Sequence, residues 1–220
     1  LKLGGKRLRP VLVYMACELF EGDLTSSIYA VKAIEVFHNF TLVHDDIMDN
    51  APMRRGKATV HEKWSQNIGI LSGDAMLIKA YDFILDANYS NANEILKTFN
   101  NVAIEVCEGQ QLDMNYENIP NVLLSDYINM IRLKTSVLLG AALKIGAQIA
   151  NADKKDCDLI YDFGVNLGIM FQLMDDYLDA FGDPEKFGKQ IGGDIISNKK
   201  TFLFIKALEL DQTGEMQKWM

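Results

Sequence analysis

Apolar residues recur at steps of three and four along most of this chain, which is the spacing of one buried helix face. Short polar joints separate these stretches, and alternating strand-like runs are few. The pattern predicts helices over approximately residues 8–20, 26–49, 68–88, 92–114, 124–150, 154–181 and 198–210. Long helices joined by short connections indicate a helical bundle, an all-α fold.

Local signals refine two features of this bundle. Thr25-Ser26-Ser27 offers an N-cap for the second helix, and Asn50-Ala51-Pro52 ends it. Glycines at helical spacing would let helices approach each other closely, and the candidates are Gly140, Gly146, Gly164 and Gly168.

Composition narrows the protein class. The 220 residues are 49% apolar and carry a net charge of −8, so we expect one domain over residues 1–220 and no nucleic-acid partner. The chain begins at Leu1 rather than Met, from which we expect native N- and C-terminal segments to be missing. Three scattered cysteines fit reduced thiols, and no signal peptide or bilayer-length apolar run is present. A cytoplasmic protein is therefore expected.

The strongest chemical signal is a pair of Asp-Asp-x-x-Asp blocks, each at the end of a predicted apolar helix. Their carboxylates are Asp45, Asp46 and Asp49 in the first block and Asp175, Asp176 and Asp179 in the second. At helical spacing the first block continues the stripe of His38 and Thr41, and the second continues that of Gln172. We expect both stripes to point into a shared interior cleft.

The position of these acids argues against a purely structural role. A helix C-terminus carries partial negative charge, so each acid there is unfavourable by roughly 0.3–1 kcal/mol. A compensating cation is needed, and carboxylate oxygens suit Mg²⁺ better than zinc. Two alternatives remain open: solvated helix ends, and a calcium loop, although neither block has the ligand spacing of an EF-hand.

Basic residues near glycines or helix ends form a second signal. They occur at Lys6 to Arg9, Arg54-Arg55, Lys134, Lys189 and Lys199-Lys200. Any one cluster could be ordinary surface charge. Together with two acidic metal sites they suggest a diphosphate held by Mg²⁺ on one side and by Arg and Lys on the other.

Taken together, these motifs resemble those of a known family, the trans-prenyltransferases, which include farnesyl and geranylgeranyl diphosphate synthases. The matching motifs follow one another along nearly the whole chain: Gly4 to Pro10, His44 to Asp49, Arg54 to Gly56, Gly73-Asp74, Gly109-Gln110 with Asp113, Lys134-Thr135, Phe171-Gln172 with the second Asp block, Gly188-Lys189 and Gly192 to Asp194. The resemblance implies an isoprenoid-synthase-type helical bundle around a deep central cavity, usually a homodimer.

The resemblance also implies roles. Asp45, Asp49, Asp175 and Asp179 would hold three Mg²⁺ ions against an allylic diphosphate, supported by Asp46 and Asp176. Contacts to that diphosphate would come from Arg54, Lys134, Lys189 and Lys199. Isopentenyl diphosphate would bind Gly5, Lys6, Arg9, His38 and Arg55. Thr135 and Gln172 would turn oxygens toward the developing carbocation, and the implied product is an all-trans prenyl diphosphate.

Product length depends on what closes the cavity below the first block. Phe40 lies five residues before Asp45, about one and a half turns deeper, and Thr41 beside it is small. In the family a bulky aromatic at this position stops the product at C15 or C20, which is the length we expect. Plain core packing of Phe40 is the alternative.

Two other functions compete with this interpretation. A class I terpene cyclase normally has an Asn/Ser/Glu pattern as its second metal site, and it needs no isopentenyl site. A non-catalytic subunit of a heteromeric synthase tends to lose the Asp blocks, both of which this chain keeps.

Overall fold

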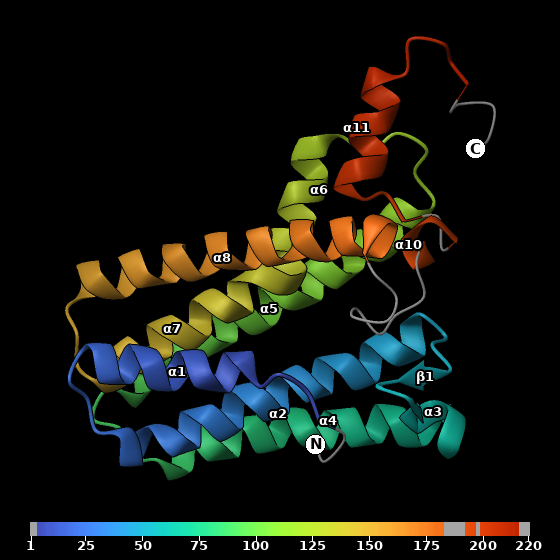
Figure 1. The fold of residues 1–220 in the computed structure, drawn as a ribbon. Coiled ribbons are helices and arrows are strands. Elements are labelled where there is room, and N and C mark those ends of the chain that lie inside the picture. Colours follow the sequence, from blue (N-terminus) through green and yellow to red (C-terminus); the bar gives the residue numbers. More distant parts are fainter. Residues whose placement is uncertain (1–3, 183–191, 197–198, 216–220) are drawn as a thin grey trace. The chain divides into compact units, whose positions relative to one another are not determined.

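The computed structural model describes residues 4–182, 192–196 and 199–215. By its contacts the chain divides into two compact units, residues 1–101 with 139–162 and residues 102–138 with 163–220. Three helices have residues in both units: α5 (Ala92–Glu117), α7 (Val137–Ile149) and α8 (Lys154–Phe181). The described residues are overwhelmingly helical (Figure 1), so the predicted all-α fold is confirmed.

The first unit is built around α2 (Leu24–Met48), which packs against α1 (Leu8–Leu19) and α4 (Gln66–Asp86) (Figure 1). The predicted cap at Thr25-Ser26-Ser27 is wrong by two residues. Asp23 is the N-cap, and its carboxylate accepts hydrogen bonds from the backbone N–H groups of Thr25 and Ser26. Asp competes well with Ser and Thr for this position because its oxygens reach the same free N–H groups.

Close helix contacts give this unit its core. Phe37 is fully buried and meets Phe99 of α5 edge-on, with ring centroids 5.1 Å apart. Gly146 of α7 lies against α1, where a Cβ atom would come within 2.3 Å of the Val13 carbonyl oxygen. The expectation that Gly146 permits close packing is therefore confirmed.

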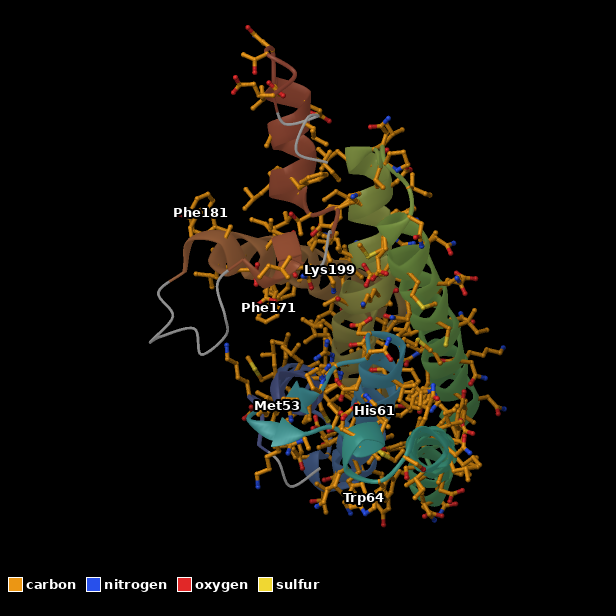
Figure 2. The ribbon with its side chains drawn as sticks, turned by 90° about the vertical axis from the view of Figure 1, so that its right-hand side faces the viewer. Met53, His61, Trp64, Phe171, Phe181 and Lys199 are labelled. Carbon is orange, nitrogen blue, oxygen red and sulfur yellow. The ribbon has the colours of Figure 1, made fainter. Side chains whose placement is uncertain are left out.

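A small hairpin follows α2 and was not predicted. Strand β1 (Met53–Arg54) pairs antiparallel with β2 (Lys57–Ala58), and α3 (Val60–Lys63) follows. Arg55 and Gly56 form the turn with φ of 53° and 73°, the left-handed backbone that a tight two-residue hairpin requires. The side chains of Met53 and Trp64 in this segment are exposed (Figure 2).

The second unit contains α6 (Leu124–Ile131), the π-helical turn η1 (Arg132–Ser136), α10 (Gly193–Ile196) and α11 (Phe202–Leu210). Helix α6 packs on α11 (Figure 1), around a core that includes Tyr127 and Ile205. The helix predicted over residues 124–150 is thus interrupted by η1, and the helix predicted from residue 198 begins at Phe202.

Glycines again permit close approach within this unit. A Cβ atom on Gly168 of α8 would lie 2.5 Å from the Cα atom of Ser136, which confirms the packing role expected for Gly168. In the described part of the chain, no helix combines the length and the apolar composition that crossing a bilayer requires.

Candidate functional site

The first aspartate block occupies the last turn of α2, as predicted. Asp45 and Asp46 lie in the helix and Asp49 is its C-cap. Arg54 reaches back from the hairpin, and its Nε atom donates to Oδ1 of Asp46 at 2.8 Å. Its Nη2 atom lies 3.4 Å from Oδ2 of Asp45. Burial raises the pKa of Asp46, and the charge and hydrogen bond of Arg54 oppose that rise.

His44, the residue before this block, is fixed by α4. Its Nε2 atom lies 3.1 Å from the carbonyl oxygen of Ile70. A Cβ atom on Gly73 would come within 2.2 Å of the same nitrogen, so only glycine leaves room for this imidazole. Gly73 therefore lets the His44 imidazole pack against α4 beside the block.

Four of the five residues predicted to bind isopentenyl diphosphate form two adjacent contact pairs. Arg9 Nη1 lies 3.2 Å from Nε2 of His38. Arg55 donates from Nη1 to the Gly4 carbonyl oxygen, and its guanidinium fills the space where a Cβ atom on Gly5 would lie. Lys6, the fifth residue, is exposed.

This cluster is strongly positive. Burial, then the charges of Arg9, Arg55, Arg54 and Arg7, lower the pKa of His38 to about 2, so its ring is neutral at pH 7. Burial lowers the pKa of Arg9 to about 10, which still leaves the guanidinium charged. The Nε atom of Arg9 is buried and has no hydrogen-bond partner among the described residues. A buried, charged N–H group without a hydrogen-bond partner is well suited to donate to a bound anion.

Carboxylates balance only part of this charge. Arg7, which has a left-handed φ of 51°, forms an ion pair with Glu35, and the Glu35 carboxylate also accepts from Nδ2 of Asn39 at 2.8 Å. Glu35 was not among the predicted site residues. It lies three residues before His38 on α2, so helical spacing alone could have identified it.

The residues predicted to set product length have ordinary packing contacts. Phe40 is 8% exposed, and its ring centroid lies 5.5 Å from that of Phe37 and 4.8 Å from that of His44. Thr41 donates from its hydroxyl to the carbonyl oxygen of His38, at 2.8 Å. These contacts agree with the core-packing alternative and leave the product-length role a prediction.

The second aspartate block lies near the end of α8. Asp176 and Asp179 are buried, at 4% and 8% exposure, and Asp175 is half-buried. Oδ2 of Asp179 accepts the backbone N–H of Asp194 at 3.1 Å, and its carbonyl oxygen accepts the N–H of Gly192. The residues around α10 are therefore tied directly to this block.

Two of the predicted catalytic residues of this unit, Gln172 and Thr135, form a chain of hydrogen bonds to Asp176, and a third, Lys134, pairs with Asp113. Gln172 donates from Nε2 to Asp176 Oδ1 at 3.1 Å, and Thr135 donates to Oε1 of Gln172 at 3.4 Å. Lys134 donates from Nζ to Oδ2 of Asp113, 2.5 Å away. Asp113 was quoted for its motif but not predicted as a site residue.

A cavity of about 230 Å³ gathers these groups within the second unit. It is lined by Asp113, Tyr116, Glu117, Tyr127, Met130, Ile131, Lys134, Thr135, Gln172, Asp175, Asp176, Asp194, Lys199, Lys200 and Thr201. Lys199 lies at the foot of α11 (Figure 2). Lys189, predicted to bind the same diphosphate, falls outside the described residues.

The charge around the second block fits a cation. Burial, followed by the charges of Asp179, Asp176 and Asp175, raises the pKa of Asp194 to about 6, although Lys199 opposes the rise. Such an accumulation of acid is relieved by a divalent ion with oxygen ligands. Over residues 4–182, 192–196 and 199–215, no group of three or more His, Cys, Asp and Glu side chains is gathered as a metal site. Mg²⁺ commonly takes one or two carboxylates and completes its shell with waters and phosphate oxygens.

Two further residues of this cavity were not among the predicted site residues: Tyr127 was not named at all, and Asp194 was named only as part of the Gly192 to Asp194 motif. The Tyr127 hydroxyl donates to Oδ2 of Asp176, and burial and the charge of Asp176 raise the pKa of Tyr127. Tyr127 lies seven residues before Lys134, a helical spacing that could have drawn attention to it.

Known proteins match this chain along its full length. A sequence profile of the polyprenyl synthetase family matches residues 1–220. The geranylgeranyl diphosphate synthase of Sulfolobus acidocaldarius is 44% identical over 96% of this chain and 66% of its own length. A crystal structure of a geranylgeranyl pyrophosphate synthase is 56% identical with a TM-score of 0.95, covering 99% of this chain and 67% of that one.

A third relative has been solved with ligands. The polyprenyl synthase of Caulobacter crescentus, complexed with calcium and isoprenyl diphosphate, is 32% identical with a TM-score of 0.91, over 99% of this chain and 65% of that one. The chain spans 63–66% of the length of four curated relatives that it matches. On the full-length profile match and these identities, the chain belongs to the polyprenyl synthetase family.

Proposed function

We propose that this protein is a Mg²⁺-dependent prenyl-diphosphate synthase acting as one domain. It condenses isopentenyl diphosphate with an allylic diphosphate (dimethylallyl, geranyl or farnesyl) and releases diphosphate. The product is a short-chain all-trans prenyl diphosphate of C15–C20. Relatives named geranylgeranyl and geranylfarnesyl diphosphate synthases support this class of reaction.

The observation that carries the proposal is the positive cluster around Arg9. A terpene cyclase handles one diphosphate, whereas a synthase needs a second anion site for isopentenyl diphosphate. Arg9 offers a buried, unsatisfied Nε donor beside the neutral ring of His38. Arg55 lies beside the glycine turn at Gly5, where backbone and guanidinium together suit a phosphate group.

The aspartate blocks and the basic residues near them would bind the allylic diphosphate. Each block would hold Mg²⁺ that stabilises negative charge on a diphosphate leaving group. The ligands would be Asp45 and Asp49 in the first block, and Asp175 and Asp179 in the second. Lys134 and Lys199 line the cavity beside the second block and add positive charge to that leaving group.

The reaction then proceeds through ionisation, condensation and proton loss. The allylic C–O bond breaks, and its electron pair leaves with the diphosphate. The double bond of isopentenyl diphosphate attacks the allylic carbon, which forms one C–C bond and leaves a positive charge on the isopentenyl unit. A C–H bond on the neighbouring carbon then breaks, its electron pair forms the new double bond, and its proton passes to the released diphosphate. Thr135 and Gln172, linked at 3.4 Å, present oxygens that stabilise the developing positive charge.

The direct test is a product assay with Mg²⁺, labelled isopentenyl diphosphate and each allylic diphosphate in turn. A synthase gives labelled prenyl diphosphates of C15–C20. Cyclised hydrocarbon from an allylic diphosphate alone would indicate a terpene cyclase, and no turnover without a second protein would indicate a non-catalytic subunit. Omission of Mg²⁺ is expected to abolish the product.

We also propose that the protein is a homodimer formed through α4. Leu71, Ile78 and Leu85 follow one another at seven-residue steps, and each is more than half exposed. Such a stripe on one helix face is suited to a partner helix of the same kind. Light scattering should give a dimer for the wild type, a monomer for Ile78→Lys, and a dimer for the control Met53→Lys on the hairpin.

A further inference from the structure

The Tyr127 hydroxyl donates a hydrogen bond to a carboxylate of the second aspartate block. Tyr127 is 3% exposed, and its ring is held in the core between α6 and α11. Its O–H donates to Oδ2 of Asp176, which is itself 4% exposed. A tyrosine that only filled space here would not need a hydroxyl, because a phenylalanine ring would fill the same volume.

Asp176 accepts hydrogen bonds from three elements at once. Gln172 of α8 donates to Oδ1 at 3.1 Å. Tyr127 of α6 donates to Oδ2, and the backbone N–H of Phe202, at the first turn of α11, donates to the same oxygen at 3.5 Å. Both carboxylate oxygens are therefore engaged by protein donors.

The neighbouring acids differ from Asp176. Asp175 is half-buried and lines the cavity. Asp179 accepts one backbone N–H, that of Asp194. Because both of its oxygens already accept hydrogen bonds from the protein, Asp176 is poorly suited to turn toward a metal.

We propose that Tyr127 is a positioning residue of the second aspartate block. Its hydroxyl fixes Asp176 as a strut that joins α6, α8 and the start of α11, so that Asp175 and Asp179 are presented to the metal ions. This inference deepens the proposed function and rests on it for its catalytic consequence. The strut itself is a property of the folded chain without ligands.

The strut also has a consequence for the basic segment before α11. Lys199, Lys200 and Thr201 line the same cavity and lead directly into Phe202. Asp176 accepts the Phe202 N–H, so the Tyr127 hydroxyl helps to fix the start of α11, while the Lys199 N–H is held separately by the Asp194 carbonyl oxygen at 2.9 Å. Loss of that hydroxyl should loosen the first turn of α11 as well as the block.

The first experiment measures amide hydrogen exchange of residues 202–205 in the ligand-free protein, comparing wild type with Tyr127→Phe. Removing a hydrogen bond to a buried carboxylate is expected to accelerate exchange there by about tenfold.

The matched control is Tyr89→Phe. Tyr89 has a partly buried hydroxyl, which donates to the Ser26 carbonyl oxygen at 2.8 Å in the first unit. The control should leave residues 202–205 unchanged. An acceleration below about threefold in Tyr127→Phe would overturn the strut.

The second experiment measures prenyl transfer against Mg²⁺ concentration. Residues that orient metal ligands typically change metal affinity by about 10–100-fold when mutated. Tyr127→Phe should therefore need about tenfold more Mg²⁺ for half-maximal rate, and Tyr89→Phe should match the wild type. Equal Mg²⁺ requirements for both variants would contradict the positioning role.

A double-mutant cycle closes the test. Asp176→Asn removes the negative charge to which the Tyr127 hydroxyl donates. The double variant should therefore need little more Mg²⁺ for half-maximal rate than either single variant. Fully additive effects would contradict the shared role. If the wild type transferred no prenyl group at all, the proposed function would fail, while the exchange comparison would still decide whether Tyr127 holds Asp176.

Discussion

Gly109 on α5 lies directly against the backbone of Lys134 in the π-helical turn. A Cβ atom at Gly109 would come within 2.2 Å of the Lys134 nitrogen and 2.6 Å of its Cα atom. Because Gly109 has no side chain, the π turn can approach α5 closely enough for Lys134 to reach Asp113, which lies one turn beyond Gly109.

Gly109→Ala should push this turn away from α5. Because the clash is with backbone, which cannot rotate aside, the free energy of unfolding should fall by about 2 kcal/mol, measured by urea titration. Prenyl transfer should also fall, since Lys134 is displaced. Gly69→Ala is the control: its Cβ meets the flexible end of the Ile47 side chain, so both effects should be much smaller.

Asp45→Ala and Asp179→Ala should each abolish measurable turnover while the helical circular dichroism stays native. If Asp45 and Asp179 hold Mg²⁺ as proposed, each change removes an oxygen ligand where charge develops in the reaction, and we expect kcat to fall by about 10³-fold or more. Asp82→Ala removes an exposed carboxylate paired with Lys79 and should leave kcat unchanged. Near-normal turnover in either block variant would contradict the metal-site interpretation.

Phe40→Ala should lengthen the product if Phe40 closes the cavity below the first block. The variant should also lose about 3–5 kcal/mol of stability because a buried ring is removed. Phe99→Ala is matched in burial, at 2% exposure, and should lose similar stability without changing the product. Chromatography of the products separates the two cases, and an unchanged length in Phe40→Ala would leave it a core residue.

His38 should make the protein less stable in mild acid. Its pKa is lowered to about 2 in the folded chain, from 6.5 for an ordinary histidine, so the unfolded chain binds more protons between those values. Stability is then fully present above pH 6.5 and falls as pH decreases toward 2.

Urea titrations at pH 7 and pH 5 measure this dependence. Between these values His38 should cost the wild type about 2 kcal/mol. His38→Gln keeps a polar group near Arg9 but cannot titrate, so its loss over the same interval should be smaller by about that amount. Equal losses in the two proteins would show that His38 does not contribute.

The helices were largely predictable, because apolar spacing carries the signal along most of the chain. The ends of α8 and the start of α5 fell where they were expected. The hairpin at Met53–Ala58 was missed because two-residue strands leave no periodic pattern. The π turn at Arg132–Ser136 was missed because one extra residue in a turn is invisible to a period read over a long window.

The candidate site likewise contains residues that the sequence could predict and contacts that it could not. Charged motifs at helix ends were visible in the sequence, so the aspartate blocks and Lys134 could be named in advance. The pairings of these residues could not be predicted, since Asp113 meets Lys134, and Tyr127 meets Asp176, only through the packing of α5, α6 and α8. Burial of Asp176 beneath three donors is likewise a tertiary property that no single helix specifies.

The π turn has one more consequence, for how insertions and deletions would act on this helix. It holds one residue more than an α turn of the same rise, so every side chain after Ser136 is rotated by about 100° from where a continuous α-helix would place it. Deleting a single residue from Arg132–Ser136 would allow an ordinary α turn while keeping both flanking helices in register with their neighbours. Such a shortened chain should fold, with a higher free energy of unfolding, yet lose the placement of Lys134 and Thr135 along the cavity. The π turn should therefore lower stability while it brings these two side chains to the cavity.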